Sequence, residues 1–152
     1  MKRKQKVLKP RVLFNASVIL SGINSPEGGS AKVLSLAKKR EITGYISEII
    51  FDEVLRHVGK FDLAKKEIMK FCLDIFSKVL PVPDEDTVKK YQKVIVDEGD
   101  AHVLASCEDE RVDYLVTLDK KHLLVLKGKI KGLKIVTPGE FIELSTKSIK
   151  KD

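Results

Sequence analysis

Three acidic residues, Glu53, Asp100 and Asp119, are the strongest candidates for chemistry in this sequence, together with Asn15. Carboxylates that converge on one place repel one another and raise each other's pKa, and a hard divalent cation relieves that repulsion. Mg²⁺ needs only one or two carboxylates plus a substrate phosphate, and Mn²⁺ suits the same ligands. These residues therefore predict a Mg²⁺ or Mn²⁺ site at which a metal-activated water attacks a phosphodiester.

Asp100 and Asp119 belong to one stretch, residues 98–119, in which a helix should precede a buried strand. The apolar residues after Asp100 fill one broad face at about 100° per residue, which predicts a helix with Asp100 at its start. Residues 112–117, VDYLVT, are too apolar for a solvent-facing strand and are typical of the centre of a parallel sheet. Open α/β sheets bind ligands outside the carboxyl ends of their strands, so we expect Asp100 and Asp119 to meet at one rim.

The other two candidates should reach the rim from earlier elements. Residues 11–15 read as a first strand, which places Asn15 at its end, before a turn and further packed chain. Ser47 is expected to cap a helix that reaches about residue 58, and Glu53 lies at the edge of its buried stripe. A glutamate there can equally extend to water or pair with Arg56, so helix geometry alone leaves its role open.

The remaining pattern predicts an alternation of strands and helices. Further helices are expected at 31–39 with Ser30 as N-cap, and at 62–77, 84–96, 120–126 and 137–143; further strands are expected at 42–46, 79–80 and 133–136. This order indicates an α/β fold with helices on both faces of a parallel sheet. We expect a single domain over residues 1–152, with loose basic ends at about 1–10 and 146–152.

Composition narrows the class of protein. The net charge of +7 and the sequence pI of about 9.3 suggest a polyanionic partner, although surface lysines give the same balance in many enzymes that touch no nucleic acid. No apolar run approaches the roughly 18 residues of a membrane helix, and the basic start lacks the apolar core of a signal peptide. We therefore expect a cytoplasmic protein with no membrane association, in which Cys72 and Cys107 are buried free thiols.

Five motifs resemble the PIN domain family, over about residues 10–144. They are RVLFNASVILSGI at 11–23, SEIIFDEV at 47–54, GDAHVLASC at 99–107, YLVTLDKKHLL at 114–124 and PGEF at 138–141. The resemblance implies a three-layer α/β/α sandwich with a central parallel sheet of about five strands. It also implies a metal-dependent endoribonuclease, often the toxin of a toxin–antitoxin pair and often a homodimer.

Carried over residue by residue, the resemblance assigns Glu53, Asp100 and Asp119 as catalytic and metal-binding residues. The sequence departs from the family at the first acid, because Asn15 stands where the family has aspartate and Ser17 where it has asparagine. Asn15 can still offer a carbonyl oxygen to the metal, but it cannot act as a base.

Two functions follow as alternatives: an endoribonuclease that cuts single-stranded RNA, or a degenerate domain that binds RNA or a protein partner without cutting. Ser17 and Thr117 are the candidate substrate contacts, and the Thr117 hydroxyl can instead orient Asp119. The three histidines, His57, His102 and His122, are expected to be surface or supporting residues.

Overall fold

A single five-stranded parallel sheet lies at the centre of the computed structural model, which describes residues 9–58, 64–95 and 97–150. The strand order is β3-β2-β1-β4-β5, and every neighbouring pair is parallel. The strands are β1 (Arg11–Phe14), β2 (Thr43–Ser47), β3 (Lys78–Leu80), β4 (Tyr114–Val116) and β5 (Lys134–Val136). The predicted α/β fold with a parallel sheet of about five strands is confirmed.

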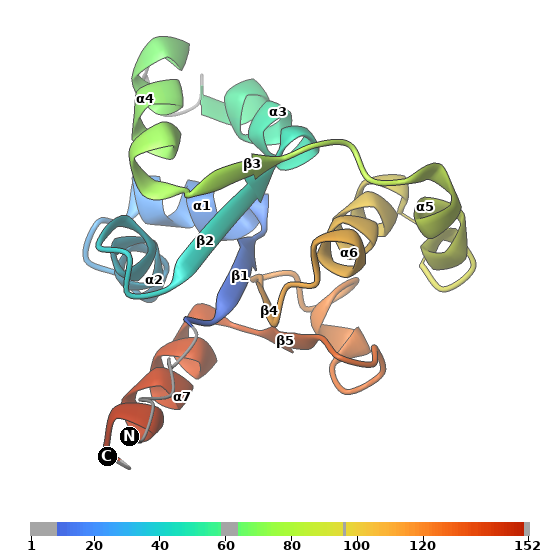
Figure 1. Ribbon diagram of the computed structural model, residues 1–152. Helices are drawn as coiled ribbons and strands as arrows, with labels where there is room; N and C mark the ends of the chain where they lie inside the picture. Colours follow the sequence, from blue (N-terminus) through green and yellow to red (C-terminus); the bar gives the residue numbers. More distant parts are fainter. Residues whose placement is uncertain (1–8, 59–63, 96, 151–152) are drawn as a thin grey trace, which may run out of the picture.

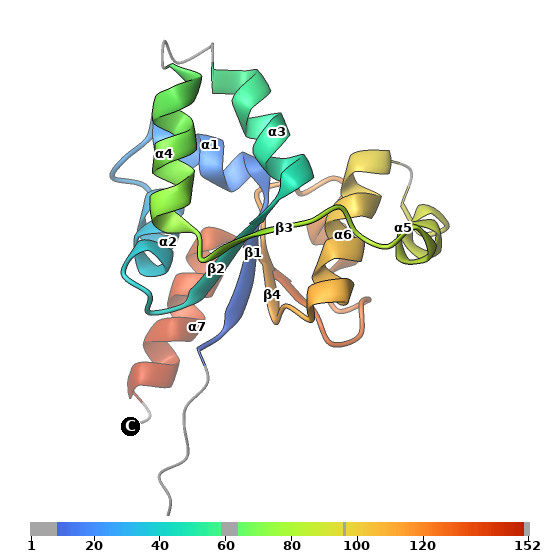
Figure 2. The ribbon, with the colours of Figure 1, turned by 45° about the horizontal axis from the view of Figure 1, so that its top comes forward.

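Helices cover both faces of this sheet, which gives the predicted three-layer arrangement. They are α1 (Ala16–Asn24), α2 (Gly29–Lys38), α3 (Glu48–His57), α4 (Lys65–Ile75), α5 (Glu85–Gln92), α6 (Glu98–Glu110), α7 (Pro138–Lys150) and the short 3-10 helix η2 (Leu124–Leu126). Figures 1 and 2 show α1, α2, α4 and α7 on one side of the sheet and α5 and α6 on the other. Helix α3 contacts α1 and α4 and also reaches α6.

The central strands are buried because both of their faces are covered. Val12, Leu13 and Phe14 of β1 have no exposed surface, and neither do Leu115 and Val116 of β4. The chain runs from β1 outward to β3, then returns to place β4 and β5 on the other side of β1. This reversal leaves the carboxyl ends of β1 and β4 side by side, which is where open α/β sheets bind ligands.

Four predicted elements differ from the structure. Residues 16–24 form helix α1, where we expected a turn and irregular packed chain, because Asn15 caps a helix at that point. Helix α2 begins at Gly29, so Ser30 lies inside it and is not the N-cap. Most of 120–126 is turn, and only η2 is helical.

The fourth difference is the length of α7, which continues to Lys150 although we expected a loose end from residue 146. The N-terminus of α7 is stabilised by a capping box that Thr137 and Glu140 form. The Glu140 amide donates to the Thr137 hydroxyl at 3.1 Å, and the Thr137 amide donates to the Glu140 carboxylate at 2.9 Å. The predicted loose segment 1–8, the helix residues 62–63 and Val96 lie outside the described residues.

Two further expectations can be compared with the structure. Cys72 and Cys107 are free and buried, as predicted, and burial raises the pKa of the Cys72 thiol to about 12. In the part of the chain that the structure describes, no helix combines the length and apolar character needed to cross a membrane.

Helix α2 packs tightly against the sheet at Gly44 of β2, and this contact gives a stability prediction. A Cβ atom at Gly44 would lie 2.7 Å from the Cβ of Ala37 and 3.4 Å from a ring carbon of Phe14. Because both neighbours are fully buried, Gly44→Ala is expected to lower the free energy of unfolding by about 1–3 kcal/mol through overpacking.

Urea denaturation of the purified variant measures this cost. Gly139→Ala is the matched control, because a Cβ at Gly139 in the first turn of α7 meets no atom within 4 Å. The control should stay within about 0.5 kcal/mol of the wild type, as most surface substitutions do. Equal stability of the two variants would contradict the tight contact between α2 and β2.

Candidate metal centre

The candidate site lies where the chain reverses its direction of travel across the sheet, between β1 and β4. Asn15 directly follows β1, and its amide donates to the Val116 carbonyl at 3.0 Å. Thr117 follows β4, and its amide donates to the Val136 carbonyl at 3.0 Å. These bonds carry the sheet ladder one residue beyond each strand, so Asn15 and Asp119 leave the sheet at fixed positions.

Asp119 is held by its own turn. Its backbone amide donates to the Thr117 hydroxyl at 3.1 Å, and its carbonyl accepts the Leu124 amide at 2.8 Å. Its carboxylate atom Oδ1 accepts the backbone amides of Lys121 at 3.1 Å and His122 at 2.9 Å. The second carboxylate atom, Oδ2, takes no part in this turn and lies 3.4 Å from the His122 Nδ1 atom.

Thr117 supports this turn from inside the protein. Its side chain has no exposed surface, and its hydroxyl accepts the Asp119 amide. Thr117 therefore positions Asp119, which is one of the two roles that the sequence suggested, and its contact with substrate stays a prediction.

Asp100 reaches the same site from the first turn of α6. Asp97 is the N-cap of this helix, and its side chain accepts the Asp100 amide at 3.0 Å. The pKa of Asp100 is raised to about 6, first by burial and then by the negative charges of Asp97, Asp119 and Glu53; the nearby His122 opposes this rise. The carboxylate is therefore poised to accept a positive partner.

Asp100, Asp119 and His122 form the group that can hold a cation. One potential ligand atom from each of these three residues lies within 4.8 Å of the others. The His122 Nδ1 atom is 3.4 Å from the Asp119 Oδ2 atom. Two converging carboxylates, of which Asp100 has a raised pKa, lie beside a partly exposed imidazole, and this set of ligand atoms fits a divalent cation.

Glu53 belongs to the same region but not to this group. It is half-buried on α3, and its negative charge is close enough to contribute to the raised pKa of Asp100. The sequence had left open a pair with Arg56, and the structure places Arg56 against Asp52 instead, with 3.2 Å between their charged atoms. Among the described residues, the three-member group excludes Glu53.

Asn15 has a structural task that the sequence did not reveal. Its side-chain oxygen accepts the hydroxyl of Ser17 at 2.9 Å and the amide of Ser17 at 3.4 Å, which caps α1. The Ser17 hydroxyl in turn accepts the Leu118 amide at 3.1 Å. This chain of bonds ties the end of β1, the start of α1 and the end of β4 together, and the carbonyl that we expected to bind metal already carries two hydrogen bonds.

His122 is the functional candidate that sequence reasoning missed. The signal was its position three residues after Asp119, since a turn closed by the Asp119 carboxylate brings residues at that spacing together. His57 and His102 are not members of the cation-binding group in the described chain.

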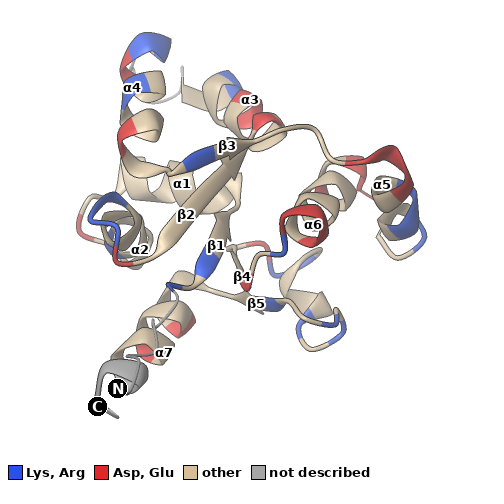
Figure 3. Cartoon of the chain, in the orientation of Figure 1, with Lys and Arg blue, Asp and Glu red and all other residues tan. Residues whose placement is uncertain are grey.

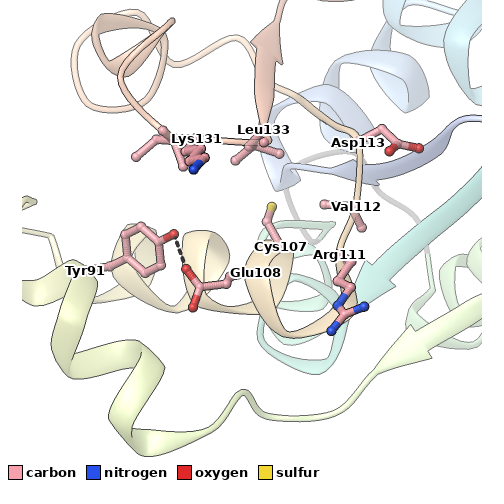
Figure 4. A pocket seen from close by; sticks show the side chains of 10 residues that line it. Tyr91, Cys107, Glu108, Arg111, Val112, Asp113, Lys131 and Leu133 are labelled. Carbon is pink, nitrogen blue, oxygen red and sulfur yellow. Dashed lines mark hydrogen bonds between the residues drawn. The ribbon is translucent and has the colours of Figure 1, made fainter.

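A pocket lies at the other end of the strands from the candidate site, near the amino ends of β4 and β5. It has a volume of about 410 Å³ and is lined by Tyr91, Cys107, Glu108, Arg111, Lys131 and Leu133, among others (Figure 4). The Glu108 carboxylate in this pocket already has two hydrogen-bond donors: the Tyr91 hydroxyl at 2.8 Å and the Lys90 ammonium at 2.7 Å. These bonds lower the pKa of Glu108, and burial raises the pKa of the Cys107 thiol, so neither group is poised for chemistry.

Comparison with protein families identifies one match. The family model described as PIN domain matches residues 11–121, which is more than half of the chain and includes Asn15, Glu53, Asp100 and Asp119. Among curated proteins, no sequence matches this chain.

Solved structures with similar folds include a toxin–antitoxin complex. A toxin–antitoxin complex from Klebsiella pneumoniae is 19% identical, covers 84% of this chain and 97% of its own, and has a TM-score of 0.62. VapBC2 from Rickettsia felis, bound to a DNA fragment from its promoter, is 17% identical with coverages of 82% and 96% and a TM-score of 0.59. The protein PAE2754 from Pyrobaculum aerophilum is 21% identical with coverages of 90% and 96% and a TM-score of 0.63. At these identities the likeness concerns the fold.

Proposed function

This chain belongs to the PIN domain family, and from that premise we propose that it is a metal-dependent endoribonuclease that cuts single-stranded RNA. The observation that carries the proposal is the convergence of Asp100 and Asp119 at the reversal point of the sheet, with the pKa of Asp100 raised to about 6. Such a pair is costly in a metal-free protein and becomes favourable when a cation neutralises it.

Mg²⁺ or Mn²⁺ bound at this site would supply an activated water and a positive charge against the phosphate. Asp100 and Asp119 hold the ion, and Glu53 adds negative charge at the edge of the site. Thr117 holds Asp119 in position because its buried hydroxyl accepts the Asp119 amide. Ser17 is half-buried beside them, and its hydroxyl keeps one free lone pair after its bonds to Asn15 and Leu118, so we retain it as a contact for a water or a substrate group.

The surface around the site favours an anionic substrate. Lys120 and Lys121 directly follow Asp119 and are exposed, and further lysines lie along the connection from β4 to β5 (Figure 3). These ammonium groups can neutralise RNA phosphates next to the acidic group, which on its own would repel them. Binding of this kind weakens steeply as salt rises, because it releases condensed counterions.

We further propose that the protein acts as the toxin of a toxin–antitoxin pair, with an antitoxin protein as partner and a homodimer as its own assembly. The support is the set of similar folds, which includes a toxin–antitoxin complex from Klebsiella pneumoniae and FitAB bound to a DNA fragment. Co-expression with the product of an adjacent gene, followed by size-exclusion chromatography, tests for this partner.

A second candidate function is a degenerate domain that binds RNA or a protein without cutting. The observation that favours it is the bonding of Asn15, whose side-chain oxygen is committed to Ser17 and which brings no negative charge to the site. A site with fewer carboxylates holds a hard cation less tightly.

One experiment separates the two functions. The purified chain is incubated with labelled single-stranded RNA and either Mn²⁺ or Mg²⁺, with EDTA and an Asp119→Asn variant as controls. Cleavage that requires metal and Asp119 is the expected result. Intact RNA under both metals, together with RNA binding that weakens with salt, would support the degenerate domain instead.

A further inference from the structure

His122 places a nitrogen atom at a site whose other candidate ligands are oxygens. Its Nδ1 atom is 3.4 Å from Asp119 Oδ2, and its side chain is 46% exposed, so solvent and ions have access to it. Two atoms bonded to one ion at about 2.1 Å, at octahedral or tetrahedral angles, lie roughly 3 to 3.5 Å apart. The observed separation of 3.4 Å falls within this range, so the two atoms are placed where they could both bind one ion.

The local backbone holds Asp119 and His122 in place without using Asp119 Oδ2 or His122 Nδ1. The His122 amide and the Lys121 amide both donate to Asp119 Oδ1, which closes the turn and fixes residue 122 relative to the carboxylate. Asp119 Oδ2 and His122 Nδ1 take no part in these backbone bonds, and Asp100 is the third member of the group. The separation of 3.4 Å is longer than the usual 2.7–3.2 Å between the nitrogen and oxygen atoms of a hydrogen bond, so these two atoms do not form a short hydrogen bond with each other.

The composition of the site favours one class of metal. Mg²⁺ prefers oxygen ligands alone, whereas first-row transition metals also accept an imidazole nitrogen, Mn²⁺ the least strongly of them. The neutral Asn15 removes a carboxylate from the family's acidic set, and its oxygen is occupied by Ser17. The loss of a hard oxygen ligand weakens the preference for Mg²⁺, and the gain of a nitrogen ligand strengthens the preference for a transition metal.

We infer that His122 is a direct metal ligand, together with Asp100 and Asp119, and that it makes the site select a first-row transition metal such as Mn²⁺ over Mg²⁺. This inference rests on the proposed metal-dependent function and specifies the metal of that same site. It concerns binding, so it can be tested without any RNA.

The first measurement is the affinity for each ion. Mn²⁺ binding to the full chain is followed by the loss of the free-ion electron paramagnetic resonance signal, and Mg²⁺ binding by competition. His122→Ala is expected to weaken Mn²⁺ binding by about tenfold or more and to leave Mg²⁺ binding within about threefold, because only the transition metal gains from the imidazole. His122→Asp, which restores an all-oxygen site, is expected to remove the preference for Mn²⁺ while raising the affinity for Mg²⁺.

The second measurement detects the bond itself. Electron spin echo envelope modulation of the Mn²⁺-loaded protein should show coupling to a ¹⁴N nucleus, and this coupling should vanish in His122→Ala. His57→Ala is the matched control, because His57 bonds to the Glu53 carbonyl of its own helix at 2.8 Å and is outside the cation-binding group. The control should keep both the coupling and the affinity.

The outcomes separate this inference from the proposed function. Mn²⁺ that binds through Asp100 and Asp119 without nitrogen coupling, or with an unchanged preference in His122→Ala, would overturn the role of His122 and leave the metal-dependent nuclease intact. A wild-type chain that binds neither ion at millimolar concentration would overturn both.

Discussion

Replacing Asp100 with asparagine is expected to lower metal-dependent RNA cleavage by more than about 100-fold. Even residues that only support metal ligands typically change affinity or activity by 10- to 100-fold, and Asp100 is proposed to touch the ion itself. The same variant should lose the rise in melting temperature that Mn²⁺ gives the wild type, since an ion stabilises only the folded state that binds it.

The variant should at the same time be more stable than the wild type when no metal is present. The pKa of Asp100 is about 6 in the folded chain, above its ordinary value of 3.8, mainly because the group is buried near other acids. Between these two values the unfolded chain ionises first, so the free energy of unfolding falls as pH rises, and the full cost is present above pH 6. After allowance for solvent screening of a half-exposed group, removal of the charge should gain about 1 kcal/mol at neutral pH and nothing near pH 3.

Urea denaturation in EDTA at pH 7.5 and at pH 3 measures the stability change, and a single-stranded RNA assay measures the activity. Asp74→Asn is the matched control, because it makes the same chemical change on the exposed face of α4, away from the site. A metal-free Asp100→Asn protein that is less stable than the wild type at pH 7.5 would contradict the strained acidic group described above.

Much of the fold could be read from the sequence because the strands are short apolar runs that end in polar residues. Residues 115–117 of VDYLVT are buried as the composition predicts, although Asp113 is exposed and Tyr114 half-buried, and Asp119 follows the carboxyl end of this strand. Asp100 was placed by the same logic, since it stands three residues after the N-cap Asp97 at the start of α6. The positions of Asp100 and Asp119 were therefore predictable, because one depends on the local helix pattern and the other on the rule that ligands bind at the carboxyl ends of parallel strands.

What could not be read depends on bonds between distant segments. We expected a turn after Asn15 because Asn15, Ala16 and Ser17 interrupt an apolar run, and the sequence did not reveal that Asn15 caps a helix there. The Leu118 amide meets the Ser17 hydroxyl across 101 residues of chain, and no local spacing reveals that contact. His122 was expected to be a surface or supporting residue, and it is exposed; its place beside Asp119 comes from the turn that Asp119 closes with its own carboxylate.

Asn15 is the residue on which the difference between an active and a degenerate domain depends, and Asn15→Asp is expected to raise metal-dependent cleavage by about tenfold or more. Aspartate and asparagine are equally good N-caps, so the bonds from Ser17 and the start of α1 should survive the change. The variant exchanges an amide NH₂ group for a second carboxylate oxygen beside the Ser17–Leu118 link. That oxygen adds negative charge to the site and strengthens the binding of a divalent cation.

The same charge should destabilise the metal-free variant, because it adds another carboxylate to a rim where the pKa of Asp100 is already raised. The variant should therefore melt below the wild type in EDTA and show a larger increase in melting temperature when Mn²⁺ is added. Asn15→Ser is the matched control, since serine also caps helices but brings no charge. It should show neither the gain in cleavage nor the larger response to Mn²⁺.

The pattern across the three proteins then assigns the role of Asn15. An inert wild type beside a cutting Asn15→Asp variant would mean that the rest of the site is intact and that the missing charge alone makes the domain degenerate. Comparable cleavage by both would mean that Asp100, Asp119 and His122 suffice to hold the ion, and that the side chain at position 15 serves the fold by capping α1. Loss of cleavage in Asn15→Asp would contradict the charge argument, because it would show that the site needs a neutral donor there.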